Sequence, residues 1–365
     1  MTLDARDPSI TAKEGRNGRD QQDPERIKVP GWQQRQVSDT PFALGTFRAP
    51  DGAEVAGLVI GQDVHALAPH LGPGTTIAGL LDGWDEAFTQ LRSLASRLAG
   101  RPADHDAGAL RPLPPVWPPR QLFQAGANYR QHVAELIAGG GASEQERQAA
   151  QRAVDERARN GRPYVFLGLP HSLAGALDDI VLPAAVREVD WELELAAVIG
   201  RRAWRVGRED ALSHVAGYTI CNDITARDHV FRPDLRGIGS DWLAGKNWPT
   251  FFPTGPSLVP APYAGDPMAL EIRLWLNGQV MQDSTTADMM FDIARLIEHA
   301  SSIAELRPGD LLLTGSPPGN GVVHGRFLQD GDVIDAEITG LGRQRNHCVA
   351  ERAGQTPSAS RRSRE

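Results

Sequence analysis

The segment VDWELELAAVIG, residues 189–200, alternates acidic and apolar side chains and then becomes wholly apolar. Side chains of a β-strand point to opposite faces in turn, so Asp190, Glu192 and Glu194 share one face of the predicted strand. The apolar end of the segment indicates a strand that is buried on both faces. Carboxylates on a buried face repel one another and are costly to remove from water, and a bound divalent cation relieves both costs. The alternative is an exposed acidic face without a cation.

A second predicted strand supplies another carboxylate. The segment GYTICNDITARD, residues 217–228, ends its apolar part at Asn222 and Asp223. Asp223 taken alone is typical of a turn or of a helix N-cap. Beside the first strand, however, it would complete a set of three carboxylates with Glu192 and Glu194. Such an all-oxygen set suits Mg²⁺, Mn²⁺ or Ca²⁺ and does not suit zinc, so the two strands together predict a site for a hard cation.

A histidine and a glutamate stand at the start of a predicted helix. RQLFQA, residues 120–125, predicts a short buried strand, and GANYRQHVAE, residues 126–135, leads from it into the helix. His132 and Glu135 are three residues apart and would lie on the same helix face. The two residues are either an ion pair at the start of the helix or a general base with the carboxylate that orients it. Both alternatives agree with this spacing.

Two glycine-containing segments add further candidates. WLAGKNWPTFFPTGP, residues 242–256, places Lys246 after a glycine among aromatic residues and prolines, which is unusual for a solvated lysine. The segment is not a phosphate loop, because its glycine spacing and the residue after the lysine do not fit that motif. RPGDLLLTGSPPGNG, residues 307–321, predicts a strand that ends in a tight turn around Gly315. The N–H groups and the Ser316 hydroxyl of such a turn can hold an oxyanion or a carboxylate.

The chain as a whole predicts a β-rich α+β protein. Short apolar segments separated by turn residues dominate from residue 163 onward, with one clear helix at 287–303. The proline-rich RPLPPVWPPR segment, residues 111–120, indicates a domain boundary. The predicted parts are a disordered tail at 1–39, a small N-terminal domain at 40–112, a larger catalytic domain at 113–350 and a second disordered tail at 351–365.

Composition excludes several classes of protein. The 365-residue chain has a formal net charge of −8 and an isoelectric point near 5.7, which argues against nucleic acid or an anionic membrane as a partner. Only Cys221 and Cys348 occur, so neither a disulfide framework nor a cysteine zinc site is predicted. The first residues lack the apolar part of a secretory leader, and no apolar run reaches the ~18 residues of a membrane helix. These features predict a soluble, cytoplasmic protein.

Taken together, the motifs resemble those of the fumarylacetoacetate hydrolase family. The family pattern N-Y-x-x-H-x-x-E matches Asn128–Glu135, and D-[YW]-E-x-E-L-A-x-V-I-G matches Asp190–Gly200. N-D-x-[ST]-x-R-D matches Asn222–Asp228, G-K matches Gly245-Lys246, and L-x-P-G-D-L-x-x-T-G-[TS]-P matches Leu306–Pro317. The resemblance extends over residues 115–345, which include no fewer than five of these motifs in the family's order.

The resemblance implies a fold, partners and site residues. It implies a mixed β-roll preceded by a small variable domain, in an enzyme that is usually a homodimer. Mg²⁺ or Mn²⁺, with Ca²⁺ as a further option, would be held by Glu192, Glu194 and Asp223. His132 and Glu135 would form a catalytic dyad, followed by a lid helix at about 136–162. The remaining matches are Lys246 with an active-site lysine, Arg227 with a substrate-binding arginine, Thr250 with a position close to the metal, and Ser316 with a position near the substrate carboxylate.

The predicted function is hydrolysis of a C–C bond in a β-dicarbonyl or acylpyruvate-like substrate. The cation would polarise a carbonyl, His132 would activate water, and Lys246 would stabilise the oxyanion. The alternative is a decarboxylase, tautomerase or hydratase of a 2-oxo acid, which uses the same metal–enolate chemistry. A non-catalytic binding module is disfavoured, because the carboxylates and the dyad are intact. Gly168 and Val230 replace a lysine and a glutamine of many family members, which favours a less charged or bulkier dicarbonyl substrate.

Overall fold

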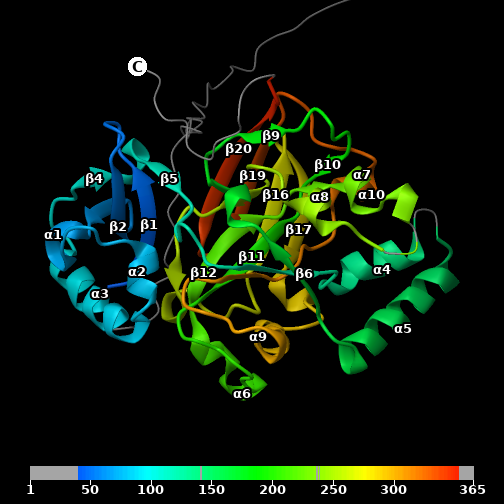
Figure 1. Ribbon diagram of the computed structural model, residues 1–365, viewed down its shortest axis with the longest axis horizontal. Coiled ribbons are helices and arrows are strands. Elements are labelled where there is room, and N and C mark those ends of the chain that lie inside the picture. Colours follow the sequence, from blue (N-terminus) through cyan, green and yellow to red (C-terminus); the bar gives the residue numbers. More distant parts are fainter. Residues whose placement is uncertain (1–39, 140–141, 236, 238, 353–365) are drawn as a thin grey trace, which may run out of the picture.

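The structure, a computed structural model, describes residues 40–139, 142–235, 237 and 239–352. The tails predicted at 1–39 and 351–365 lie outside these residues, apart from 351 and 352. The described part of the chain is a mixed fold of strands and helices, as predicted, with curled sheets at its centre (Figure 1). Within it, no helix is long and apolar enough to cross a membrane.

A small five-stranded sheet with three helices forms the N-terminal part (Figure 1). Its strands, in the order β4-β3-β2-β1-β5, are β1 (Ala43–Arg48), β2 (Glu54–Ile60), β3 (Asp63–Ala66), β4 (His105–Asp106) and β5 (Arg111–Leu113). Its helices are α1 (Ala68–Leu71), α2 (Ile77–Leu81) and α3 (Trp84–Leu98). The start of the predicted linker is thus strand β5; its Pro112 is tolerated because β5 lies at a sheet edge, where one side needs no hydrogen bonds.

Two larger sheets form the rest of the molecule. The eight-stranded sheet contains β6 (Leu122–Gly126), β7 (Tyr164–Gly168), β8 (Leu173–Gly175), β11 (Leu193–Ile199), β12 (Val215–Asn222), β14 (Phe252–Thr254), β15 (Val259–Pro260) and β18 (Leu311–Leu313). The five-stranded sheet contains β9 (Ile180–Leu182), β16 (Glu271–Leu276), β17 (Gln279–Thr285), β19 (Val333–Ile338) and β20 (Gly342–Ala350). A short separate pair consists of β10 (Val189–Asp190) and β13 (Thr225–Ala226).

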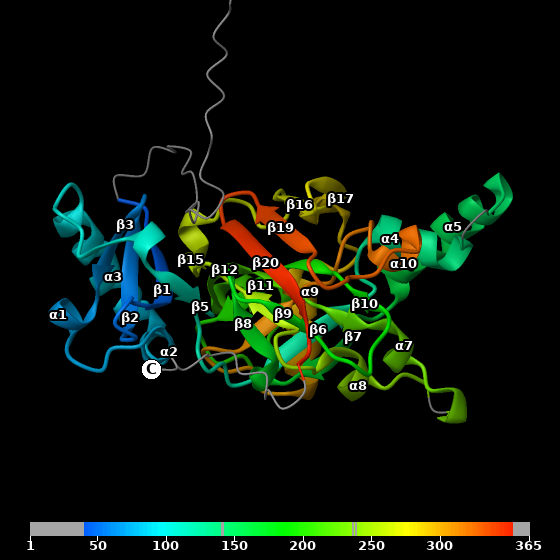
Figure 2. The ribbon, with the colours of Figure 1, turned by 90° about the horizontal axis from the view of Figure 1, so that it is seen from above.

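Seven helices of the described residues accompany these sheets. They are α4 (Arg130–Ala138), α5 (Glu144–Asn160), α6 (Arg208–Ala211), α7 (Arg227–Val230), α8 (Trp242–Lys246), α9 (Ile293–Ile303) and α10 (Gly321–His324). Helix α9 is shorter than predicted at its start, because the Asp292 carboxylate caps it by accepting a hydrogen bond from Arg295 N. Helices α4, α5 and α10 lie together at the side of the molecule opposite the N-terminal sheet (Figure 2).

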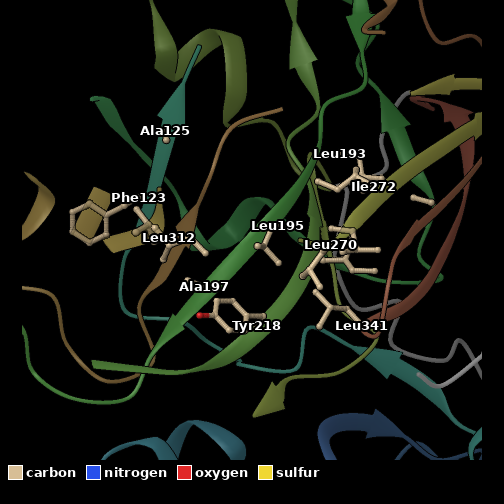
Figure 3. Close-up of a cluster of buried hydrophobic side chains, with 14 of the residues drawn as sticks. Phe123, Ala125, Leu193, Leu195, Ala197, Tyr218, Leu270, Ile272, Leu312 and Leu341 are labelled. Carbon is tan, nitrogen blue, oxygen red and sulfur yellow. The ribbon is translucent and has the colours of Figure 1, made fainter. Parts of the chain in front are cut away.

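Strand β11 is buried on both faces, as its sequence predicts. Leu193, Leu195 and Ala197 belong to the core between the two large sheets, where Leu193 lies near Ile272 of β16 (Figure 3). Ala196 and Val198 on the other face join a second cluster that reaches the N-terminal sheet. Glu194 shares this second face, so the strand directs one carboxylate away from the main core.

Strand directions bring the candidate residues to one end of the eight-stranded sheet. Strand β18 is parallel to β6 and antiparallel to β11, and β11 is antiparallel to β12. The carboxyl ends of β6, β12 and β18 therefore meet the beginning of β11. Asp223 follows β12, Gly315 follows β18, and Glu192 precedes β11, so this end of the sheet carries the candidate site.

The lid predicted as one helix at about 136–162 is two helices, α4 and α5, with residues 140–141 outside the described part. The second of these helices also packs against the rest of the molecule. Ala150, Val154 and Ala158 of α5 are buried, because residues four apart form a narrow apolar stripe along one helix face. Arg295 further ties the end of α5 to α9 by donating hydrogen bonds to the carbonyls of Ala158 (2.7 Å) and Gly161 (2.9 Å).

Candidate active site

Three buried carboxylates converge at the end of the eight-stranded sheet. One oxygen from each of Glu192, Glu194 and Asp223 lies within 4.8 Å of the others. Antiparallel pairing of β11 with β12 produces this convergence, and Asp223 N donates a 2.8 Å hydrogen bond to the Glu192 carbonyl. The Asn222 side chain fixes the same backbone by accepting a 2.9 Å hydrogen bond from Glu192 N. The geometry therefore brings together the three residues that the sequence predicts as metal ligands.

Asp190, on the same predicted strand face, has a different environment. Its carboxylate accepts hydrogen bonds from Gly321 N (2.6 Å) and Trp191 N (2.8 Å), and from Arg227 Nε (2.8 Å). Asp190 lies in β10, which pairs with β13 instead of continuing β11. Its carboxylate thus holds the start of α10 and the Arg227 guanidinium, and the described contacts give it no place among the three converging oxygens.

Lys246 lies directly against two of the three carboxylates. Its ammonium donates to Asp223 Oδ2 (2.6 Å), to Glu192 Oε2 (2.7 Å) and to the Asp223 carbonyl (3.1 Å). The side chain is only 2% exposed, at the end of helix α8, whose start is capped by Asp241. Burial alone would lower the lysine pKa, but the charges of Asp223 and Glu192 outweigh burial and raise it. Lys246 is therefore a cation within the site.

Arg227 is the second cation of the site and pairs with Asp190 and Glu192. Burial would raise the Glu192 pKa, but Arg227 and Lys246 hold it at about 2. Burial, followed by the charges of Asp223 and Glu192, raises the Glu194 pKa well above its usual value. With all groups ionised, the site has two more negative than positive charges. The count takes four carboxylates and two cationic side chains: Asp190, Glu192, Glu194 and Asp223 against Lys246 and Arg227. This excess, together with an all-oxygen donor set, fits one divalent cation.

The turn after β18 supplies a backbone donor to the carboxylates. Gly315 N donates a 2.7 Å hydrogen bond to Glu194 Oε2. Glycine is required here, because φ is 92° and an added Cβ would lie 2.8 Å from the Cβ of Asn128. Asn128 in turn donates to the carbonyls of Phe291 and Thr314, which fixes the segment between β6 and α4. The predicted anion-holding turn thus contacts a carboxylate of the protein itself.

His132 and Glu135 lie on α4, and no hydrogen bond or ion pair of the described residues joins their side chains. Glu135 Oε1 accepts a 3.2 Å hydrogen bond from Gln131, and Glu135 Oε2 and His132 Nδ1 have no hydrogen-bond partner among the described residues. Burial lowers the His132 pKa to about 4, with Glu192 opposing and Arg227 and Lys246 adding to the effect. His132 is thus a neutral imidazole whose pKa is affected by the charges of Glu192, Arg227 and Lys246. The predicted pairing of His132 with Glu135 is not formed in this structure.

Thr250 and Ser316 have contacts outside the group of three carboxylates. Thr250 has a positive φ of 69°, and its hydroxyl accepts a 2.8 Å hydrogen bond from Val181 N at the neighbouring strand β9. The Ser316 hydroxyl accepts hydrogen bonds from Gln282 (3.0 Å) and Asn320 (3.2 Å). Val230, one of the departures from the family pattern, is buried and packs where a Cβ on Gly245 would be. All of these contacts are within the protein, and the predicted contacts of Thr250 and Ser316 with substrate stay predictions.

A cleft of about 820 Å³ opens beside Glu135, between α4, α5 and α10. Its walls are largely apolar, and Glu135 lines it together with Leu136, Val322 and Val323. Asp190, which pairs with Arg227, holds the start of α10 and so ties one wall of the cleft to the carboxylate site.

Sequence analysis did not identify Gln124 as a site residue. Gln124 lies on β6, is fully buried, and donates from Nε2 to Asp223 Oδ1 at 3.2 Å. The available signal was an uncharged polar residue inside the apolar stretch QLFQAG, a position at which a buried amide requires partners. Periodicity alone gave no reason to connect that residue with an aspartate 99 positions later.

Comparisons with known proteins identify relatives of this chain. Residues 121–349 match the family model described as fumarylacetoacetate (FAA) hydrolase C-terminal. The chain is 36% identical to a mitochondrial oxaloacetate tautomerase of Bos taurus, over 77% of this chain and 81% of that protein. A probable 2-hydroxyhepta-2,4-diene-1,7-dioate isomerase from Mycobacterium abscessus shares the fold, with a TM-score of 0.65 and 28% identity, covering 85% of this chain and 99% of that one.

A further solved structure is that of maleylpyruvate hydrolase from Sphingobium sp. SYK-6, in complex with manganese(II) and pyruvate. It has a TM-score of 0.64 and 27% identity, covering 85% of this chain and 100% of that one. The chain therefore belongs to the fumarylacetoacetate hydrolase family and is an enzyme of that family. The predicted β-roll is confirmed, and the predicted homodimer stays a prediction.

The predicted cytoplasmic location is contradicted by these relatives. Several of them, from Bos taurus and Xenopus laevis, are named as mitochondrial proteins. The prediction depended on the lack of an apolar secretory leader. That criterion concerns the secretory route and does not separate the cytoplasm from an organelle that imports proteins by other signals.

Proposed function

We propose that this protein is a divalent-metal-dependent enzyme that forms and reprotonates the enolate of a 2-oxo acid, as a keto–enol tautomerase does. The observation that carries this proposal is the buried convergence of Glu192, Glu194 and Asp223, which forms an acidic, all-oxygen donor set. The 36% identity to an oxaloacetate tautomerase supports the same class of reaction. The relative with bound manganese(II) and pyruvate supports both a divalent ion and a 2-oxo acid ligand.

The three carboxylates would hold Mg²⁺ or Mn²⁺, because hard divalent ions prefer oxygen ligands. When bound, such an ion supplies Lewis acidity, which stabilises an enolate relative to the neutral ketone. The protein's own groups would do the rest. The ammonium of Lys246, adjacent to Asp223 and Glu192, would stabilise the negative charge that develops on a substrate oxygen.

His132 is the proposed proton carrier. Burial holds its pKa at about 4, so the imidazole is neutral near pH 7 and can accept a proton from the carbon next to a carbonyl. The same low pKa makes the protonated ring a good acid, which suits transfer of the proton to the enolate oxygen. Tautomerisation requires only this one residue to move a proton, whereas hydrolysis also requires a positioned water.

A hydrolase of C–C bonds is the second candidate. It is favoured by the position of Glu135, one helical turn after His132, with its buried Oε2 free of partners among the described residues. The maleylpyruvate hydrolase relative supports it as well. Against it, no hydrogen bond joins Glu135 to His132 in this structure, so the water-activating dyad is not assembled. In either reaction, the cleft beside Glu135 would receive the variable arm of the substrate.

The test is to follow both reactions on one purified sample with Mg²⁺ or Mn²⁺. Loss of the enol absorbance of oxaloacetate reports tautomerisation, and pyruvate formed from acylpyruvates reports C–C cleavage. We expect accelerated enol loss that EDTA abolishes and Mn²⁺ restores, with little pyruvate formed. Faster pyruvate release from an acylpyruvate than enol loss would favour the hydrolase. A manganese-loaded protein without effect on oxaloacetate or on other 2-oxo acids would refute the proposal.

A further inference from the structure

We infer that Gln124 is a positioning residue of the metal centre, and that residue 168 is glycine because the Gln124 side chain occupies the space beside it. The inference rests on the proposed metal-dependent function. It concerns how Asp223 is held, which neither the family match nor the three-carboxylate geometry specifies.

Gln124 fixes one oxygen of Asp223. Its Nε2 donates to Asp223 Oδ1 at 3.2 Å, while Lys246 donates to Oδ2 at 2.6 Å. Both carboxylate oxygens therefore have donors from opposite sides, on strand β6 and helix α8. A carboxylate held at two points keeps its plane, which is how groups behind a metal ligand set its orientation.

The amide also leaves the Asp223 charge in place. Lys246 and Arg227 bring positive charge to the carboxylates, whereas an amide donates a hydrogen bond without neutralising its acceptor. Gln124 thereby orients Asp223 at no cost to the attraction between that carboxylate and a divalent cation. The direction of the amide follows from the contact, since an ionised carboxylate only accepts hydrogen bonds.

The other end of the amide is an available acceptor. Gln124 Oε1 is buried and has no hydrogen-bond partner among the residues that the structure describes. Buried acceptors are seldom left without a partner, and the amide orientation is fixed by Asp223. Gln124 Oε1 is therefore left as an acceptor without a protein partner beside Asp223.

Gly168 makes this arrangement possible. Strands β6 and β7 pair with Leu122 opposite Gly168. A Cβ at residue 168 would lie 3.1 Å from Gln124 Nε2, 3.2 Å from Gln124 Cδ and 3.1 Å from the Phe252 ring. These distances are shorter than ordinary van der Waals contact, and Phe252 is buried and cannot withdraw easily. A larger residue at 168 therefore shifts the amide away from Asp223.

The experiment measures Mn²⁺ binding by calorimetry, independently of activity. Gln124→Leu keeps the volume and removes the amide, and it should weaken Mn²⁺ binding roughly ten- to a hundred-fold, the usual effect of losing a group that orients a metal ligand. Gly168→Ala should weaken it in the same direction. In the Gln124→Ala background, where the colliding amide is gone, Gly168→Ala should have no further effect on Mn²⁺ affinity.

The matched control is Gln344→Leu. Gln344 is also a buried glutamine, its Nε2 donates to the carbonyls of Ile220, Pro253 and Gly255, and its Oε1 likewise lacks a partner among the described residues. This variant should lower the melting temperature and leave Mn²⁺ affinity within about twofold, since metal affinity falls chiefly with groups that touch a ligand.

Three results would overturn the inference. They are unchanged Mn²⁺ affinity in folded Gln124→Leu, an equal loss of affinity in Gln344→Leu, and an undiminished effect of Gly168→Ala in the Gln124→Ala background. Failure of the proposed function looks different, because the wild-type protein and a Glu194→Gln variant would then bind Mn²⁺ equally weakly.

Discussion

The ammonium of Lys246 lies 2.6 Å from Asp223 Oδ2 and 2.7 Å from Glu192 Oε2, so one lysine pairs with two of the three candidate metal ligands. The same two carboxylates are candidate ligands of a divalent cation. Lysine and metal would therefore compete for these two carboxylates. This competition gives Lys246 opposite effects on metal affinity and on catalysis.

Lys246→Met should tighten Mn²⁺ binding by at least about tenfold, because a positive charge within ~4 Å of a bound cation is strongly repulsive at a buried site. The metal-free variant should be less stable, since removing one partner of a buried ion pair costs roughly 3–5 kcal/mol. Turnover should fall, because the proposed stabiliser of the enolate is lost. Calorimetric Mn²⁺ titration and thermal unfolding in EDTA check the first two effects, and weaker Mn²⁺ binding in this variant would contradict the competition.

Asp190→Asn and Glu194→Gln should separate a structural carboxylate from a metal ligand. Asp190 accepts hydrogen bonds from Arg227 and from the start of α10, so Asp190→Asn should cost roughly 3–5 kcal/mol of stability, as loss of one partner of a buried charged pair does. Glu194→Gln should abolish tight Mn²⁺ binding and change metal-free stability little, because its raised pKa already disfavours the ionised form. Chemical unfolding and Mn²⁺ titration of both variants measure this. Equal losses of Mn²⁺ affinity in Asp190→Asn and Glu194→Gln would contradict the assignment of different roles to the two carboxylates.

The fold and the centre of the site followed from the sequence because each depends on local pattern. Alternation along residues 189–200 predicts a strand, which forms at Leu193–Ile199 with Glu192 directly before it and Glu194 on the face opposite Leu193 and Leu195. Asp223 could be added because its strand was also recognisable. The sequence also indicates Lys246 as a site residue, because a lysine among aromatic and proline residues is rarely solvated.

Other features depend on contacts between distant segments, which sequence patterns do not specify. Gln124 meets Asp223 only because β6 and β12 belong to one sheet with β18 and β11 between them. The anchoring of α5 was missed because its apolar stripe consists of small residues such as Ala150, and because Arg295 comes from a helix far along the chain. Helical spacing brings His132 and Glu135 to one face but leaves their side-chain rotamers free, so it does not show whether they touch.

Arg295→Ala should loosen helix α5. The guanidinium donates to the carbonyls of Ala158 and Gly161 and lies 4.6 Å over the Phe291 ring, so its loss frees the end of the helix. Hydrogen exchange of residues 144–160 should accelerate, while Mn²⁺ affinity should stay unchanged. Arg273→Ala, which removes a surface ion pair with Asp283, is the control and should leave this exchange alone. Unaltered exchange in Arg295→Ala would show that the apolar stripe of Ala150, Val154 and Ala158 holds α5 by itself.

His132 should give the folded protein a distinct dependence on pH. Burial lowers its pKa to about 4, whereas an unfolded histidine titrates near ~6.5, so folding disfavours the protonated ring. The stability linked to His132 is therefore present above about pH 6.5 and is lost as the pH falls toward about 4. Over this range wild type should lose on the order of 3 kcal/mol more than His132→Gln. Urea unfolding at a series of pH values measures the difference, and parallel curves would contradict it.

His132→Ala and Glu135→Gln should differ sharply in turnover. His132 is the only proposed proton carrier, so its removal should lower turnover by about 10²–10⁴-fold while Mn²⁺ affinity persists. No hydrogen bond joins Glu135 to His132 in this structure, and Glu135 Oε1 accepts one from Gln131. For tautomerisation, Glu135→Gln should therefore stay within a few-fold of wild type, whereas hydrolysis through a dyad requires a loss comparable to that of His132→Ala. Measuring both variants on oxaloacetate and on an acylpyruvate, with their melting temperatures, assigns the role of each residue. Retained turnover in folded His132→Ala would exclude His132 as the proton carrier in either reaction.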